Sequence, residues 1–197
     1  MTQKNEKAIQ KLQADYANAR QYAQNNIQAL LADAKKRTAE KKYLVGASLF
    51  GMFCPDYLEF KISDSKQGKL VAEFPGKHCQ EVWLDKNGKL VYMKTRCADS
   101  SFDHESYLPV DFNGYTYYLY ASQEKFETFM NSFRAKYENG LLTEWTEGDM
   151  WMSKYTHHKN GQIECTREYF YPEAKNKWLF QFRLNSKGKV EDLVELY

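Results

Sequence analysis

Metal-binding side chain types stand together in one polar segment of the sequence, at Asp103, His104 and Glu105. Carboxylates and imidazoles are common ligands of Zn²⁺, but neighbouring residues in a loop rarely converge on one ion. His157 and His158 are also adjacent, and in a strand they would point to opposite faces and could not bind one ion together. We therefore expect surface side chains at both places and predict no metal and no cofactor.

The four cysteines show no catalytic or redox motif. Cys54, Cys79, Cys97 and Cys165 lack the C-x-x-C spacing and the spacing of zinc ligands. Cys97 and His104 could act as a nucleophile and its base, but the sequence identifies neither an orienting group for the histidine nor an oxyanion donor. A disulfide between Cys79 and Cys97 would need a shifted hairpin register. We expect reduced structural thiols, as in a cytoplasmic bacterial protein, and a chain that is not an enzyme.

The most specific candidate site is a row of side chains across the last four expected strands. The predicted row is Ser153, Arg167, Phe182 and Asp192. Hairpin registers place the first two side by side and the last two side by side, and a pairing of Tyr171 with Trp178 joins the two hairpins. Aromatic residues share this face, among them Trp151, Tyr155 and Tyr169.

Two interpretations of this row remain open. Arg167 could form a buried ion pair with Asp192 beneath a helix, satisfied within the chain. Alternatively, the face is open and Arg167 is the centre of a protein-binding surface, since Arg, Tyr and Trp dominate such centres. In the second case the partner-binding residues are Arg167, Asp192, Ser153, Trp151, Tyr155 and Tyr169.

Hairpins must position these side chains. Residues 178–197 predict a β-hairpin, because apolar and polar residues alternate on both sides of a turn at 185–188 that begins with a polar residue and ends with Gly. The same signature predicts hairpins around 158–161 and 85–88. The last of these has apolar residues on both faces, and we expect the N-terminal helix or a partner to cover one face, formed by Val82, Leu84, Leu90 and Tyr92.

Two further turns resemble these. Residues 65–68 join expected strands at 57–63 and 69–74, and residues 111–114 precede an expected strand at 115–121. The apolar run at 43–54 has twelve residues and is too short to span a bilayer, so we interpret it as buried core.

Two helices are predicted. Residues 4–42 contain neither Gly nor Pro, and small or apolar residues recur every three or four positions. They are Ile9, Leu12, Tyr16, Ala19, Ala23, Ile27, Leu30 and Ala34. The alanines favour a helix that covers a sheet over a coiled-coil dimer. Residues 122–137 predict a second helix, which Asn139 and Gly140 would end.

These elements predict an α+β protein: antiparallel meander sheets built from successive hairpins, one long N-terminal helix, and a second helix between strand groups. We expect two segments, residues 1–121 and 122–197, which could pack as one domain. A Lys-Tyr-x-x-Gly phrase at 42–46 and again at 136–140 raises the alternative of two tandem modules, each a helix followed by four strands.

In the order of its elements the chain resembles small bacterial inhibitor and immunity proteins, in which such modules present a sheet face to an enzyme. This resemblance implies a non-enzymatic module that binds another protein. A net charge of +2 argues against nucleic acid, and we expect no membrane contact and a monomer or weak dimer in the cytoplasm. Two alternatives stay open: a small-ligand carrier or enzyme with a pocket between helix and sheet, and an oligomeric structural component that assembles through the N-terminal helix.

Overall fold

The computed structural model describes residues 3–47, 50–62, 65–96, 106–121, 129–148, 151–170 and 177–196. Its helices are α1 (Gln3–Arg37), the 3₁₀ helix η1 (Gly51–Phe53) and α2 (Glu59–Ile62). Its strands are β1 (Glu40–Ala47), β2 (Gln67–Val71), β3 (Cys79–Leu84), β4 (Leu90–Arg96), β5 (Ser106–Phe112), β6 (Tyr115–Ala121), β7 (Phe129–Glu138), β8 (Leu141–Glu147), β9 (Trp151–His157), β10 (Gln162–Tyr169), β11 (Lys177–Leu184) and β12 (Val190–Glu195).

The strands form one antiparallel sheet in the order β12-β11-β10-β9-β8-β7-β6-β5-β4-β3-β1-β2. From β3 to β12 each strand pairs with the next one along the chain, and β1 lies between β3 and β2. The expected α+β class, with an antiparallel meander and one long N-terminal helix, is confirmed. The boundary expected near residue 121 falls between β6 and β7, which pair with each other.

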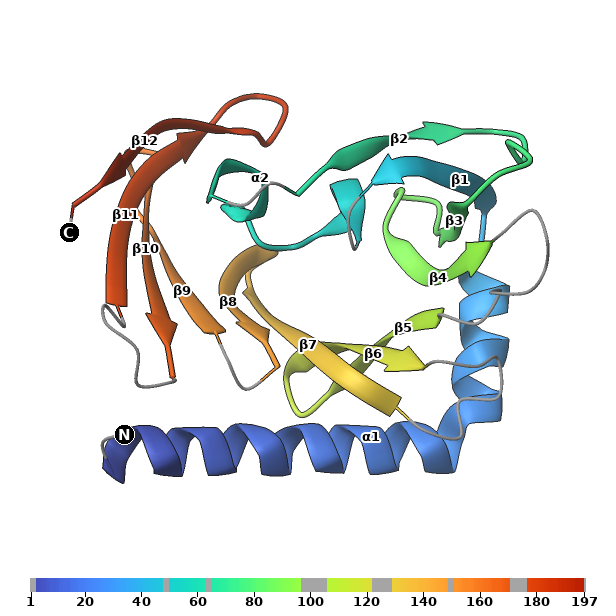
Figure 1. Ribbon diagram of the computed structural model, residues 1–197, viewed down its shortest axis with the longest axis horizontal. Coiled ribbons are helices and arrows are strands. Elements are labelled where there is room, and N and C mark those ends of the chain that lie inside the picture. The colour runs from blue at the N-terminus through green and yellow to red at the C-terminus, as the bar shows by residue number, and fades with distance from the viewer. Residues whose placement is uncertain are drawn as a thin grey trace.

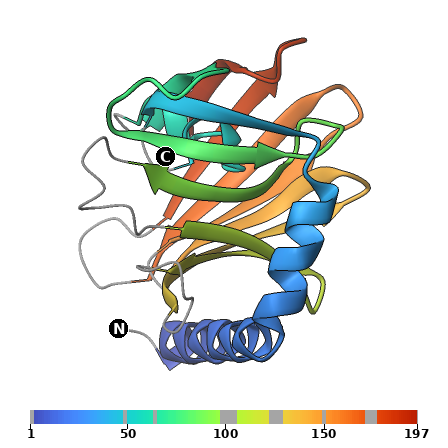
Figure 2. The same cartoon turned by 90° about the vertical axis from the view of Figure 1, so that its right-hand side faces the viewer.

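The sheet curls around the segment from Phe50 to Ile62, and α1 lies on its outside (Figures 1 and 2). This arrangement creates two hydrophobic cores, one on each face of the sheet. In the inner core Phe50 is 1% exposed, and its ring contacts those of Tyr107, Tyr118 and Phe133 at centroid distances of 4.8, 5.3 and 5.1 Å. The segment 50–62 therefore fills the concave side of the sheet.

Helix α1 forms the outer core through the predicted stripe. Leu12, Tyr16, Ala19 and Ala23 are buried against residues of β4, β5 and β6, as a helix that covers a sheet on its own chain should be. The helix ends at Arg37 rather than at residue 42, and the chain then enters β1. Among the described residues, no helix combines the length and apolar character needed to cross a membrane.

The second helix predicted at 122–137 is wrong where the structure describes it, because residues 129–138 form β7. Asn139 and Gly140 have φ angles of 52° and 78° and join Glu138 to Leu141 as a two-residue turn between β7 and β8. An Asn-Gly pair between strands is a strong signal for such a hairpin. The repeated helix-plus-strands unit is therefore not formed in the expected way.

The hairpin predicted over residues 57–74 is also wrong. Residues 59–62 form α2, and β2 pairs instead with β1, with Leu70 opposite Leu44. A local hydrogen bond explains the turn into α2: the backbone N–H of Leu58 donates to Oδ1 of Asp56 at 2.9 Å. Asp side chains that bind the backbone two residues ahead favour turns and helix starts over strands.

The hairpin between β3 and β4 is confirmed, with one correction to its faces. A bulge next to Leu84 shifts the register, so that Leu84 pairs with Leu90 while Val82 pairs with Met93. Val82, Leu84 and Leu90 therefore lie in the inner core, whereas Tyr92 lies in the outer core under α1. All four residues predicted to share one covered face are buried, but on two different faces.

Candidate functional site

The segment that leads into α2 carries Asp56 to the inner face of the sheet. Asp56 is 3% exposed and forms an ion pair with Arg167 of β10. It also accepts a hydrogen bond from the hydroxyl of Tyr155 on β9. Nε of Arg167 donates to Oγ of Ser153 at 2.9 Å. These four side chains form one connected polar cluster in an otherwise apolar core, which fixes the 50–62 segment to β9 and β10.

The predicted pairing of Ser153 with Arg167 is confirmed, but the predicted neighbour of Arg167 on its other side is wrong. Ser153 lies opposite Arg167 as expected. On the other side, however, Arg167 lies opposite Trp178, because β11 pairs with β10 four residues away from the expected register. Phe182 lies opposite Ile163 instead. An even shift keeps the same side chains on the same face, so the aromatic face itself is retained.

Asp192 is not the partner of Arg167. A bulge in β12 places Asp192 and Leu193 together opposite Phe182, between the Arg183–Glu191 and Gln181–Val194 pairs. Asp192 has a φ of 53° and is exposed, whereas Leu193 packs against the inner core. The extra residue thus reverses the alternation of β12 and turns the predicted carboxylate away from the aromatic face.

The row that the structure forms is Trp145, Ser153, Arg167 and Trp178, from β8 to β11. Beside it lies an open cleft of about 500 Å³, which we call the tryptophan cleft. Its lining consists of Asp56, Glu59, Ile62, Trp145, Glu147, Trp151, Ser153, Arg167, Trp178, Phe180 and Glu195. Residues from α2 and from five strands therefore meet at this one place.

Aromatic rings form one wall of the tryptophan cleft. The ring of Trp151 lies 4.4 Å from that of Tyr169 and 5.5 Å from that of Trp178, measured between centroids. All three side chains are half-buried, so each is supported by its neighbours and still reaches the solvent. Of the predicted binding residues, Trp151, Ser153 and Arg167 line the cleft. The ring of Tyr169 contacts that of Trp151, and Tyr155 is buried and donates its hydroxyl hydrogen to Asp56.

The carboxylates of the tryptophan cleft are crowded. Burial raises the pKa of the Glu147 carboxyl above its ordinary value, and the negative charges of Glu59 and Asp56 add to this effect while Arg167 opposes it. Arg167 cannot neutralise all of its neighbours, because its guanidinium is already bound to Asp56 and Ser153. The cleft therefore combines aromatic surface with excess negative charge.

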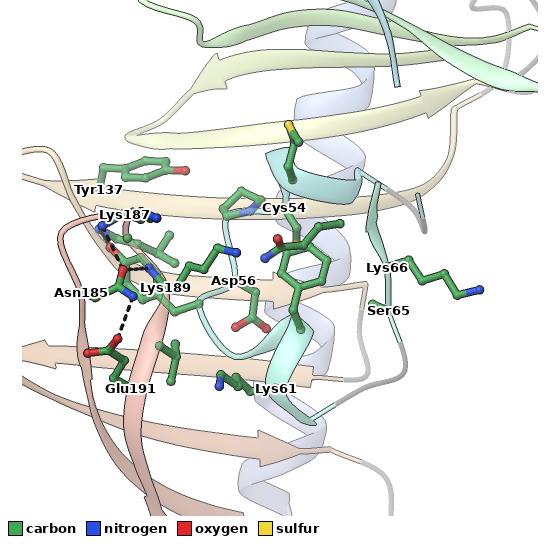
Figure 3. Close-up of a pocket in the computed structure, with 18 residues that line it drawn as sticks. Cys54, Asp56, Lys61, Ser65, Lys66, Tyr137, Asn185, Lys187, Lys189 and Glu191 are labelled. Carbon is green, nitrogen blue, oxygen red and sulfur yellow. Dashed lines mark hydrogen bonds between the residues drawn. The ribbon is translucent and has the colours of Figure 1, made fainter. Parts of the chain in front are cut away.

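A second and larger groove lies on the other side of the 50–62 segment, between β2 and the turn from β11 to β12 (Figure 3). Lysines dominate its charged lining, at positions 61, 66, 187 and 189. Asn185 orders its rim by accepting backbone hydrogen bonds from Lys187 and Lys189 at 2.9 and 3.0 Å and by donating to Glu191 at 2.9 Å. We call it the lysine groove, and its charge is opposite to that of the tryptophan cleft.

Burial or hydrogen bonding constrains two cysteine thiols and one histidine ring among the described residues. Burial raises the pKa of the Cys165 thiol to about 12 and also raises that of Cys54, so both thiols are protonated at neutral pH. Nε2 of His157 lies 2.8 Å from the carbonyl oxygen of Leu142, which occupies that ring nitrogen. The hypotheses on Cys97 and on residues 103–105 lie outside the described residues.

Sequence reasoning missed Asp56 and Glu147 as site residues, and it placed Trp178 on the aromatic face without including it among the binding residues. Nothing local connects Asp56 to Arg167, which lies 111 positions further along the chain. A signal for the turn did exist, because an Asp whose side chain can bind the backbone two residues ahead favours a turn into a helix, and Asp56 stands three residues before Glu59, where α2 begins. Glu147 is the last residue of β8 and Trp178 the second residue of β11, and the pairing register decides which side chains meet there.

Comparison of the chain with protein-family models, with curated proteins and with solved structures finds no match.

Proposed function

We propose that this protein is a non-enzymatic binding module that holds a partner protein at the tryptophan cleft. The observation that carries the proposal is the meeting of Trp151, Trp178 and Arg167 in an open cleft on a fixed sheet. Trp, Tyr and Arg are the residues that dominate the centres of protein interfaces, where large side chains enter or line desolvated pockets.

The polar cluster beneath the cleft supports this assignment. Asp56, Ser153 and Tyr155 hold Arg167 in one position, and the strands on either side carry the aromatic rings. A rigid site loses little conformational entropy on binding, and more of the contact energy is therefore available for affinity. Trp151 and Trp178 would contact the partner, with Tyr169 supporting them, and Arg167 would form the floor.

In its narrower form the proposal is an inhibitor or immunity-type protein of the bacterial cytoplasm, which acts as a monomer or weak dimer. Such a protein needs an exposed, preorganised face and no chemistry of its own. The protonated state of the Cys54 and Cys165 thiols and the bound state of His157 agree with a role in recognition. Asp192, on the edge strand β12, would then lie at the margin of the contact surface.

Affinity capture from a lysate of the native cells tests the proposal. Immobilised wild-type chain is compared with Trp151→Ala and Trp178→Ala, after circular dichroism has shown that each variant is folded at the assay temperature. Phe74→Ala is the matched control, because Phe74 is 44% exposed and does not line the cleft. We expect a protein that is captured by the wild type and the control and lost with both tryptophan variants. Capture that is equal for all four chains would refute the proposal.

A further inference from the structure

The lining of the tryptophan cleft indicates what chemical group its partner presents. Four carboxylates, those of Asp56, Glu59, Glu147 and Glu195, stand against one guanidinium, which gives the lining a formal charge of −3. They come from different parts of the chain, namely the approach to α2, α2 itself, β8 and β12. A cleft with this charge attracts a cation and repels an anion.

Aromatic side chains make the same cleft suitable for a cation that has to leave water. Trp is the aromatic residue that attracts a cation most strongly over its ring face, and Arg is the cation found there most often. The guanidinium is planar, is less strongly hydrated than an ammonium group, and can stack on a ring while it binds carboxylates at its edge. Glu147 lies opposite the half-buried Trp151 across the β8–β9 pair, so a carboxylate and an aromatic ring offer both kinds of contact at once.

The chain already contains one arginine site of this kind, between α1 and the sheet. The guanidinium of Arg134 binds Asp15 and Glu144 at 2.9 Å each and lies 4.2 Å from the ring centroid of Tyr115. Arg134 is 4% exposed, so this combination of two carboxylates and an aromatic ring holds a guanidinium out of water. The tryptophan cleft likewise combines carboxylates with aromatic rings, but these groups surround open space. Its own arginine, Arg167, is bound to Asp56 and Ser153.

We propose that the tryptophan cleft receives the side chain of an arginine from the partner protein. The inference rests on the proposed function and makes it specific: the arginine is the anchor of the interface, stacked against Trp151 or Trp178 and paired with Glu147. The lysine groove on the other side of the 50–62 segment has the wrong charge for this side chain. The opposite charges of the two clefts therefore favour binding of a basic side chain on the tryptophan-cleft side of the 50–62 segment.

N-acetyl-L-arginine amide is a suitable probe, and N-acetyl-L-citrulline amide is its neutral counterpart of nearly equal shape. The full chain is titrated with each, and the indole N–H signals of the tryptophans are followed by NMR. Trp145, Trp151 and Trp178 line the cleft, whereas Trp83 lies in the outer core beside Lys41 and serves as the internal control. We expect saturable shifts of the cleft signals with the arginine probe, a Kd of roughly millimolar order, and no saturation with citrulline.

A charge-matched pair of variants makes the test specific. Glu147→Gln removes a carboxylate from the cleft, and we expect it to weaken binding of the arginine probe about tenfold, the effect of losing a charged hydrogen bond in a partly desolvated site. Glu40→Gln removes the same charge at the exposed start of β1 and should leave the affinity unchanged. Equal weakening by both variants would mean that only the net charge matters, and the arginine site would be rejected.

The remaining outcomes separate this inference from the proposed function. Equal binding of arginine and citrulline probes would overturn the cation site, and capture of a partner that depends on Trp151 would still support the binding module. Tighter binding of N-acetyl-L-lysine amide than of the arginine probe would also overturn it, because the site would then select an ammonium group. An arginine-selective cleft without any Trp151-dependent capture would instead refute the protein-binding proposal and leave the site standing.

Discussion

The ion pair between Asp56 and Arg167 is nearly inaccessible to water, with side-chain exposures of 2% and 12%. Removing one member of such a pair leaves an uncompensated buried charge, which costs about 3–5 kcal/mol. We therefore expect Arg167→Ala to lower the free energy of unfolding by about this amount in urea titrations. Arg183→Ala, at an exposed position of β11, is the control and should change stability by less than about 0.5 kcal/mol. Similar losses in the two variants would contradict a structural role for the pair.

Glu147 gives a pH-dependent prediction. Burial, Glu59 and Asp56 raise its pKa in the folded state against the opposing effect of Arg167, so the folded protein binds this proton more tightly than the unfolded chain does. The ionised carboxylate therefore destabilises the fold at neutral pH, and this effect disappears as the pH falls through the raised pKa towards 4.5. We expect Glu147→Gln to be more stable than the wild type at pH 7, and the difference to vanish once the pH lies well below 4.5, measured by thermal unfolding. A difference that does not change with pH would contradict the raised pKa.

At the scale of single residues, the sequence predicts the contacts that a hairpin turn determines. Ser153 faces Arg167 because the turn at 158–161 sets the register from nearby residues. It does not predict Asp56 as the partner of Arg167, because that contact depends on how a distant segment is inserted into the concave face. Asp192 was the wrong choice because a bulge, with a single positive φ, reverses the alternation of a strand that is otherwise regular.

Among the elements, α1 depends on small side chains for its close approach to the sheet. Ala19 and Ala23 are completely buried. Extra methylene groups at such a position force neighbouring side chains apart and cost about 1–3 kcal/mol. We expect Ala23→Leu to destabilise the protein by this amount in chemical denaturation, while the same substitution at exposed Ala29 leaves stability almost unchanged. Equal effects at both positions would show that helix propensity, and not packing on the sheet, controls the result.

The stripe of α1 was predictable because one periodicity runs through the whole helix. The region that forms β7 was not, because phenylalanines three and four positions apart also fit a helical stripe. The Asn139-Gly140 pair favoured a hairpin, yet it is equally compatible with the end of a helix. Pairing with β6 on one side and β8 on the other favours a strand over a helix here. The sequence of the segment alone does not indicate that these partner strands exist.

Across the whole molecule, the sheet has two open edges, β2 and β12, and both border the lysine groove. Edge strands can pair with the edge of another chain unless charges or bulges prevent it. β12 carries three exposed acidic residues, Glu191, Asp192 and Glu195, together with its bulge. These features agree with the monomer or weak dimer that we propose, and they leave the tryptophan cleft as the more suitable surface for a specific partner.

The contacts of the 50–62 segment join residues that are much further apart in the sequence than those joined by the hairpins. Hairpin contacts form between near neighbours, whereas the bond from Tyr155 to Asp56 spans 99 positions. Long-range contacts form late, because the chain between them must first be ordered. We expect Asp56→Asn to speed unfolding with little change in the refolding rate, measured by stopped-flow chevron plots. Gly161→Ala, in the turn between β9 and β10 with a φ of 80°, should slow refolding instead. Equal slowing by both variants would argue against late docking of the segment.

The distance along the chain between Asp56 and Arg167 has a consequence for biosynthesis. The ribosome must add 111 residues after Asp56 before its partner exists. At elongation rates of about 5–20 residues per second this takes on the order of 5–20 s. The outer core, in which α1 meets β4, β5 and β6, has all of those strands by residue 121 and can assemble during that interval. We therefore expect the part of the inner core that packs on β8 to β11 to stay uncovered on the nascent chain until those strands emerge, where a chaperone that shields apolar chain would meet it.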